Sequence, residues 1–184
     1  TDGETATVTV EDGDLSTGES YVVDVESDTE SETPVSGERP GTTKKYTTDW
    51  SVTDRNSDNK ITNKDIDYNY GDDGSNNISS VSRNPDGTVT ITFEATTTSF
   101  DSISYDRGET IELVHQSNNV FRGEVGLSTT DSIGTLHITE GDQIAVSYFD
   151  TSQGSIESTH AIIDSDPEPL TRGPATEFSI ASLG

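Results

Sequence analysis

Residues 54–65 carry the clearest chemical pattern in the sequence. Six oxygen donors stand at positions 1, 3, 5, 7, 9 and 12 of this segment, which is the spacing of calcium-binding loops. Ca²⁺ requires six to eight oxygen ligands at short range, and this spacing wraps them around one point. The pattern therefore predicts a calcium-binding loop, with a solvated Asp- and Asn-rich turn as the alternative. The predicted ligands are Asp54, Asn56, Asp58, the main-chain carbonyl of Lys60, Thr62 and Asp65.

Two residues of this segment differ from the usual pattern. Asn59 stands at position 6, where the chain turns sharply and glycine is usual, and Asp65 has a shorter side chain than the Glu that commonly ends such loops. The preceding residues, 46–52, read as a strand rather than a helix. We therefore expect a structural calcium loop between strands rather than a helix-flanked calcium sensor.

Several smaller acidic groups are weaker candidates for a second cation site. Each also fits an ordinary acidic surface, which is the more frequent explanation in a chain this rich in carboxylates. These candidates are Asp12 and Asp14 in one turn, Asp72 and Asp73 in another, and Asp67, which shares a strand face with Asp65 if that segment is extended. Asn77-Ile78-Ser79 matches the N-glycosylation pattern, so Asn77 is a candidate for modification.

The elements that hold these residues are predicted to be β-strands. Apolar residues recur with a period of two, and Gly, Asn, Asp and Pro separate the runs. Many short strands with turns between them are typical of a sandwich. We therefore expect an all-β fold, an Ig-like or jelly-roll sandwich with an inserted calcium-binding loop. The clearest runs are 6–10, 21–25, 46–52, 89–93, 111–113, 120–127, 135–138, 144–149 and 156–163.

Composition divides the chain into three parts. Residues 1–163 are expected to form the sandwich domain, with an insertion at about 27–87 because 27–43 and 71–87 contain few apolar residues. Residues 164–174, rich in proline and carboxylates, are predicted to form a stiff, extended linker. Residues 175–184 form a predicted C-terminal strand. A strand beyond such a linker need not pair within its own domain.

Charge excludes several classes of partner. With 10 Lys and Arg against 35 Asp and Glu, the net charge of −25 would repel nucleic acids and anionic membrane surfaces. No run of about 18 apolar residues exists, so no membrane insertion is expected. The absence of Cys excludes disulfides and thiol catalysis. No nucleophile-elbow, phosphate-loop or dinucleotide motif is present, so we expect no enzymatic activity and no catalytic residues.

The same charge indicates the environment of the protein. Carboxylates are dispersed along the chain, Lys is scarce, and hydrophobic residues amount to only 27%, a composition that favours a halophilic source. An acidic, calcium-rich surface protein from an ordinary environment is the alternative. The chain begins at Thr1 and contains no Met, which predicts removal of a signal peptide or trimming. We therefore expect an extracellular or cell-surface location.

Three short motifs resemble an Ig-like β-sandwich repeat of prokaryotic surface proteins. They are Gly-Glu-Thr at 108–110 before an apolar strand, Val-Phe-Arg-Gly at 120–123 and Gly-Asp-Gln-Ile at 141–144, and residues 6–15 resemble the first strand of that repeat. The segment 54–65 resembles the calcium loops of EF-hands and, more closely, of dockerins. Similar sandwich subunits, often calcium-binding, build archaeal extracellular filaments, cannula-like tubes and surface layers. The resemblance implies a secreted structural subunit.

These features predict a homopolymer whose subunits exchange a terminal strand, serving adhesion or cohesion between cells or within a biofilm. Segments 5–10 and 175–183 are the candidate donors, with the N-terminal one slightly favoured; the alternative is that both pair within their own sheet. A second hypothesis is a monomeric, calcium-dependent carbohydrate-binding or adhesin module, in which Trp50, Tyr68 and Tyr70 would stack on surface glycans. For Trp50, the favoured interpretation is that it is the main aromatic residue of the core.

Overall fold

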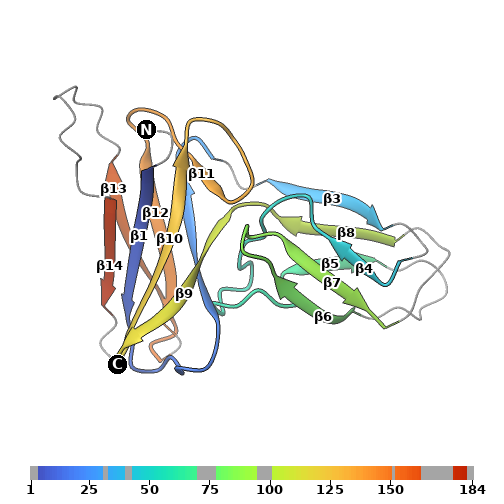
Figure 1. Ribbon diagram of the computed structural model, residues 1–184, viewed down its shortest axis with the longest axis horizontal. Helices are drawn as coiled ribbons and strands as arrows, with labels where there is room; N and C mark the ends of the chain where they lie inside the picture. The colour runs from blue at the N-terminus through green and yellow to red at the C-terminus, as the bar shows by residue number, and fades with distance from the viewer. Residues whose placement is uncertain are drawn as a thin grey trace.

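The computed structural model describes residues 4–30, 33–39, 43–69, 78–94, 101–150, 152–162 and 176–181. These residues form strands and loops, which confirms the predicted class of an all-β sandwich. Among them, no helix is long and apolar enough to cross a membrane. The strands group into two units that lie side by side (Figure 1).

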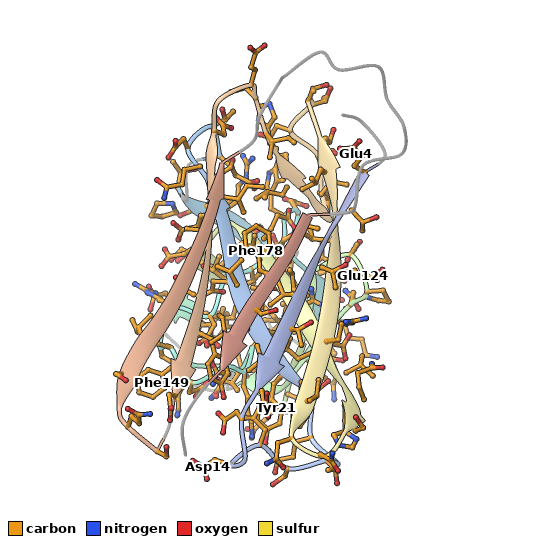
Figure 2. The ribbon with its side chains drawn as sticks, turned by 90° about the vertical axis from the view of Figure 1, so that its left-hand side faces the viewer. Glu4, Asp14, Tyr21, Glu124, Phe149 and Phe178 are labelled. Atoms are coloured by element: carbon orange, nitrogen blue, oxygen red, sulfur yellow. The ribbon has the colours of Figure 1, made fainter. Side chains whose placement is uncertain are left out.

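The first unit, called here the main sandwich, contains the first two strands and the last six. Its strands are hydrogen-bonded in the order β13-β12-β2-β9-β10-β1-β14, and β11 pairs with β10. The sheet curls so that its edge strands β13 and β14 lie next to each other (Figure 2). The strands are β1 (Glu4–Glu11), β2 (Tyr21–Ser27), β9 (Glu109–Ser117), β10 (Val120–Ser128), β11 (Thr135–His137), β12 (Gln143–Asp150), β13 (Ser155–Ile162) and β14 (Thr176–Ala181).

Alternation of side chains explains the core of the main sandwich. In β1, Ala6, Val8 and Val10 are fully buried while the residues between them are only partly covered. In β12, Ile144 and Val146 follow the same rule. Burying one such side chain contributes about 1.5–3 kcal/mol, so a low overall hydrophobic content suffices when almost every apolar residue faces inward.

Strand β14, the last described strand of the chain, contributes two side chains to this core. It pairs with β1 in parallel, with Phe178 opposite Val8 and Ile180 opposite Val10. Phe178 is 2% exposed and Ile180 6%, and both belong to the core cluster of the main sandwich. Figure 2 shows Phe178 on β14 between the neighbouring strands. The predicted linker, 164–174, lies outside the described residues.

The second unit, called here the inserted unit, lies between β2 and β9 in the chain. It consists of two three-stranded sheets, β3-β8-β5 and β4-β7-β6, which enclose a separate core. That core contains Val52, Ile66, Val89, Ile91, Phe93, Ile103 and Tyr105. The strands are β3 (Pro34–Arg39), β4 (Lys45–Thr47), β5 (Ile66–Asn69), β6 (Ile78–Arg83), β7 (Val89–Phe93) and β8 (Asp101–Asp106).

The inserted unit extends further along the chain than the expected insertion at 27–87. Strands β7 and β8 follow residue 87 and pack in the same second core. The sequence Asn84-Pro85-Asp86-Gly87 looks like a boundary, yet it is the hairpin turn between β6 and β7. There the Gly87 N–H donates to the Asn84 carbonyl at 3.0 Å, and Gly87 has a φ of 81°.

Candidate metal centre

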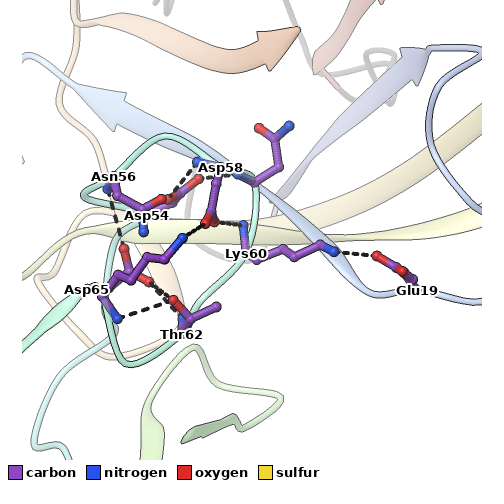
Figure 3. A network of polar contacts seen from close by, with 9 residues as sticks. Glu19, Asp54, Asn56, Asp58, Lys60, Thr62 and Asp65 are labelled. Atoms are coloured by element: carbon purple, nitrogen blue, oxygen red, sulfur yellow. Dashed lines mark hydrogen bonds and ion pairs between the residues drawn. The ribbon is translucent and has the colours of Figure 1, made fainter. Parts of the chain in front are cut away.

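The loop formed by residues 54–65 lies at the junction of the two units and leads into β5. Its first residue, Asp54, donates its main-chain N–H to Asp24 Oδ1 on β2 at 3.2 Å. Its sixth residue, Asn59, accepts the N–H of Val22 on β2 at 2.7 Å. The predicted calcium ligands are therefore held against the main sandwich and not at the outer end of the inserted unit. Figure 3 shows how the chain curls around these side chains.

The carboxylate of Asp54 organises the first half of the loop. It accepts the main-chain N–H of Asp58 at 3.2 Å and that of Asn59 at 2.5 Å. Burial raises the pKa of Asp54 to about 6; the two N–H groups oppose this shift, and repulsion from Asp65 and Asp58 adds to it. A cation near Asp54 would relieve both burial and repulsion, because each of them penalises the unpaired negative charge.

Asp65 organises the second half in the same way. Its side chain is fully buried and accepts the N–H of Thr62 at 2.7 Å and that of Asn56 at 3.4 Å. Burial is the main cause that raises the pKa of Asp65. Positions 1 and 12 of the loop are thus buried carboxylates, each held by main-chain donors of the loop.

The basic side chains of the loop are directed at carboxylates. Lys60 Nζ forms an ion pair with Glu19, which takes this side chain away from the loop interior (Figure 3). Lys64 Nζ lies 3.4 Å from Asp58 Oδ2, and Asp58 Oδ1 accepts the N–H of Lys60 at 3.2 Å. An incoming cation would compete with the Lys64 ammonium for Asp58.

The residue types and their order fit Ca²⁺, and the backbone provides the required turn. Asn59 has a φ of 61°, the left-handed conformation for which glycine is usual at this position. In the described part of the chain, however, no three His, Cys, Asp or Glu side chains form a group that could hold a metal ion. Calcium binding here therefore requires the carboxylates to move toward a common point. Each carboxylate oxygen has two lone pairs, so it can bind a cation and still accept a main-chain N–H.

Those weaker candidates that lie within the described residues do not extend this site. Asp12 is buried on the main sandwich, where it accepts the Tyr148 hydroxyl and the N–H of Asp14. Asp67 lies outside the loop and pairs with Arg55 at 2.5 Å. The remaining candidates lie outside the described residues; they are Asp72, Asp73 and Asn77.

The aromatic residues proposed to stack on glycans have partners within the protein. The Arg107 guanidinium covers one face of the Trp50 ring, 3.8 Å from its centroid. Tyr68 packs on Phe93 with ring centroids 4.9 Å apart. Both Trp50 and Tyr68 are partly buried against the core of the inserted unit. Tyr70 lies outside the described residues.

Glu109 is a buried acid that the sequence interpretation missed. It is 4% exposed and accepts the Ser51 hydroxyl at 3.1 Å, across the junction between the two units. Burial raises the pKa of Glu109 to about 8, and the charge of Glu30 adds to the shift. Strand alternation places Glu109 on the same face as the buried Ile111 and Leu113, a signal that would have found it.

A pocket of about 610 Å³ opens beside Glu109 at the same junction. Its wall combines acidic and basic side chains from both units. The charged residues that line it are Arg83, Asp86, Glu109, Glu112, Arg122 and Glu124.

Comparison with known proteins gives no independent assignment. No protein-family model, curated protein or solved structure matches this chain.

Proposed function

We propose that this chain is a structural subunit of an extracellular filament or surface assembly. Calcium stabilises the subunit, and exchange of a terminal strand between copies links one subunit to the next. The all-β architecture and the absence of a matching enzyme motif in the sequence agree with this role. The observation that carries the proposal is the arrangement of β14.

Strand β14 is suited to exchange because its attachment to the rest of the described chain is limited. It lies at the end of the strand order, and β1 is the strand to which it is hydrogen-bonded. Two buried side chains, Phe178 and Ile180, anchor it in the core. Residues 163–175, which contain prolines, separate it from β13. The same contacts can form with a β14 from another copy, which would give a heterologous and therefore extendable assembly.

The N-terminal strand is a poorer donor than β14. β1 is paired along its whole length with β10 and on its other side with β14, so it occupies an interior position in the sheet. Removing it would separate β14 from β10 and open the core. We therefore place the exchange at β14 and not at the N-terminal segment that the sequence favoured.

Calcium has two roles in this proposal. It would bind Asp54, Asp58 and Asp65 and thereby reduce the repulsion between buried carboxylates in the loop. It would also lower the net negative charge that opposes contact between copies carrying −25 each. Both effects favour the compact, assembled state.

The proposal is tested by electron microscopy and sedimentation of the purified protein over a range of concentrations, in brine with calcium or with a chelator. We expect concentration-dependent polymers that shorten or disappear on chelation. Phe178→Ser should abolish polymers, since it removes the larger anchor of β14. Ser179→Ala changes the exposed neighbour and should leave assembly intact. A wild-type protein that stays monomeric at every concentration would contradict the proposal.

A synthetic peptide with the sequence of residues 174–184 provides the second arm. Added in excess, it should occupy the acceptor position beside β1 and terminate growth. A peptide of the same sequence carrying Ser in place of Phe178 should have no effect. Equal inhibition by both peptides would show that β14 is not the linking element.

The alternative is a monomeric, calcium-dependent module that binds carbohydrate. The contacts of Trp50 with Arg107 and of Tyr68 with Phe93 reduce the aromatic surface on which this alternative depends. Calcium-dependent binding of the monomer to polysaccharide would favour it over the filament proposal.

A further inference from the structure

Strands β2 and β12 separate just where the candidate calcium loop meets the main sandwich. The two strands pair from Ser27 with Ile144 to Asp24 with Ser147. Beyond that point β2 continues through Tyr21–Val23, where its pairing is with β9, and β12 continues to Asp150, paired with β13. The divergence leaves a gap in the sheet.

Asn59 fills this gap as if it were a residue of a strand. Its carbonyl accepts the Val22 N–H from β2 at 2.7 Å. Its side-chain amide donates to the Phe149 carbonyl at 2.7 Å and accepts the Phe149 N–H at 3.1 Å. The amide thus reproduces, on the β12 side, the paired bonds of an antiparallel ladder. Asn59 is 3% exposed, and the cavity left beside it measures only about 20 Å³, little more than one water needs.

These contacts explain why Asn stands where glycine would suit the turn better. A φ of 61° is costly for a residue with a side chain, although Asn tolerates it better than most. A glycine would remove that cost but would leave the main-chain groups of Phe149 without the amide. A buried main-chain group without a partner is destabilising, and a glycine would take the amide partner from both the N–H and the carbonyl of Phe149.

We infer that Asn59 is a positioning residue that couples the loop 54–65 to the main sandwich. The Asn59 N–H donates to the Asp54 carboxylate, so the residue that enters the sheet is held by the first predicted calcium ligand. Two further contacts also join the loop to β2. The Lys60 ammonium lies 5.1 Å from the centroid of the Tyr21 ring, and the Asp54 N–H donates to Asp24. Order in the loop is therefore transmitted to β2 and β12.

This inference rests on the proposed calcium site and adds a partner to it, the main sandwich itself. A ligand that binds only the folded loop stabilises every element that unfolds together with the loop. Calcium should therefore protect β2 and β12 against opening, although the predicted ligands all come from the inserted unit. Without the Asn59 contacts, the stabilisation should stay within the inserted unit.

The experiment is amide hydrogen exchange of the full chain, in brine that keeps it folded without calcium, read at residues 22–25 and 144–149. Calcium binding is measured on the same samples by calorimetry. For the wild type, protection of these amides should rise up to about 100-fold at a free calcium concentration about 100 times Kd. For Asn59→Gly, Kd should change less than about threefold while protection rises less than about tenfold.

Two further variants separate coupling from general destabilisation. Asn59→Asp keeps the size and turn preference of Asn but replaces the donor that faces the Phe149 carbonyl, so it should behave like Asn59→Gly. Asn118→Gly is the matched control, because Asn118 also has a positive φ, of 49°, but lies in the turn between β9 and β10. It should keep the full calcium effect. Without calcium, both Asn59 variants, and not Asn118→Gly, should exchange faster at residues 148–150.

The outcomes distinguish the two proposals. Absence of calcium binding by the wild type would overturn the calcium site and the coupling together. Calcium binding without added protection of β2 and β12 would overturn the coupling alone. The coupling would equally be wrong if Asn59→Gly showed the same protection by calcium as the wild type.

Discussion

At the scale of single residues, Glu109 is a buried acid whose ionisation should destabilise the fold. Burial raises its pKa to about 8, and the other charges that face it are Glu30, which adds to the shift, and Arg83, which opposes it. The pKa of Glu30 is itself raised, mainly by burial. The folded protein therefore keeps a proton on Glu109 that the unfolded chain releases near pH 4.5.

The sign of the resulting pH dependence follows directly. The contribution of Glu109 to the free energy of unfolding is greatest below pH 4.5. It falls as the pH rises toward 8, because the unfolded state then binds fewer protons than the folded state. Between pH 5 and 8, the free energy of unfolding of the wild type should fall by about 3 kcal/mol more than that of Glu109→Gln. Urea unfolding of both proteins at several pH values measures this difference. Glu124→Gln, an exposed control, should keep the wild-type slope; equal slopes for all three proteins would contradict the assignment.

The candidate calcium site was predictable as a list of residues but not as a geometry. Spacing alone predicts Asp54, Asp58 and Asp65 as calcium ligands, because oxygen donors at fixed offsets need no tertiary information. It could not reveal that Asn59 enters the sheet between β2 and β12, since that depends on residues about 40 and 90 positions away along the chain. The sequence shows that position 6 of the loop is Asn instead of the usual glycine. The distant contacts of Asn59 explain this difference.

At the scale of elements, β9 connects the two halves of the curled sheet. Its first part pairs with β2, and its last part pairs with β10 through Val114 opposite Arg122. The crossing is close at Gly123 on β10. A Cβ there would lie 2.1 Å from Ile111 Cγ2 and 2.3 Å from the Glu112 carbonyl oxygen. Only a glycine lets the two strands approach in this way.

Two glycines of the same strand give a matched test of this crossing. Gly123→Ala should destabilise the protein by about 3 kcal/mol or more, because the new methyl group meets main chain that cannot turn aside. Gly126→Ala places its methyl 3.3 Å from a single side-chain carbon, Thr135 Cγ2, and should cost less than about 1 kcal/mol. Chemical denaturation compares the two. Similar losses for both variants would show that the crossing is not as close as described.

Strand positions were largely predictable, whereas strand partners were not. Alternation in 6–10, 120–127 and 144–149 identified β1, β10 and β12, because one face of each strand is buried. Alternation does not specify which strand lies alongside which. Strands β1 and β14 come from the two ends of the described chain and pair in parallel, and no local sequence pattern predicts this pairing.

At the scale of the whole molecule, charge should make stability depend on salt. Repulsion among carboxylates on a chain of net charge −25 opposes the compact state. The Debye length falls from about 10 Å at 0.1 M salt to about 3 Å at 1 M, so most of the relief should occur below 1 M. We expect the Tm to rise by several degrees over this range and then to level off.

Calorimetry in NaCl at neutral pH measures this effect, and the same titration at pH 4 is its control. At that pH many carboxylates are protonated, so the salt dependence should flatten. A Tm that rises equally at both pH values would indicate a general effect of salt on burial instead of screening of charge.

The position of the inserted unit has a consequence for how the chain acquires its structure. All pairings of β3 to β8 lie within residues 34–106, so this unit can form from a contiguous stretch of chain. Strand β2, by contrast, must wait for β9 and β12, which follow the insertion. Contacts between distant residues form slowly, and the inserted unit should therefore fold first during synthesis or refolding. Strands β2 and β12 would then assemble against loop 54–65 of the inserted unit, which has already folded.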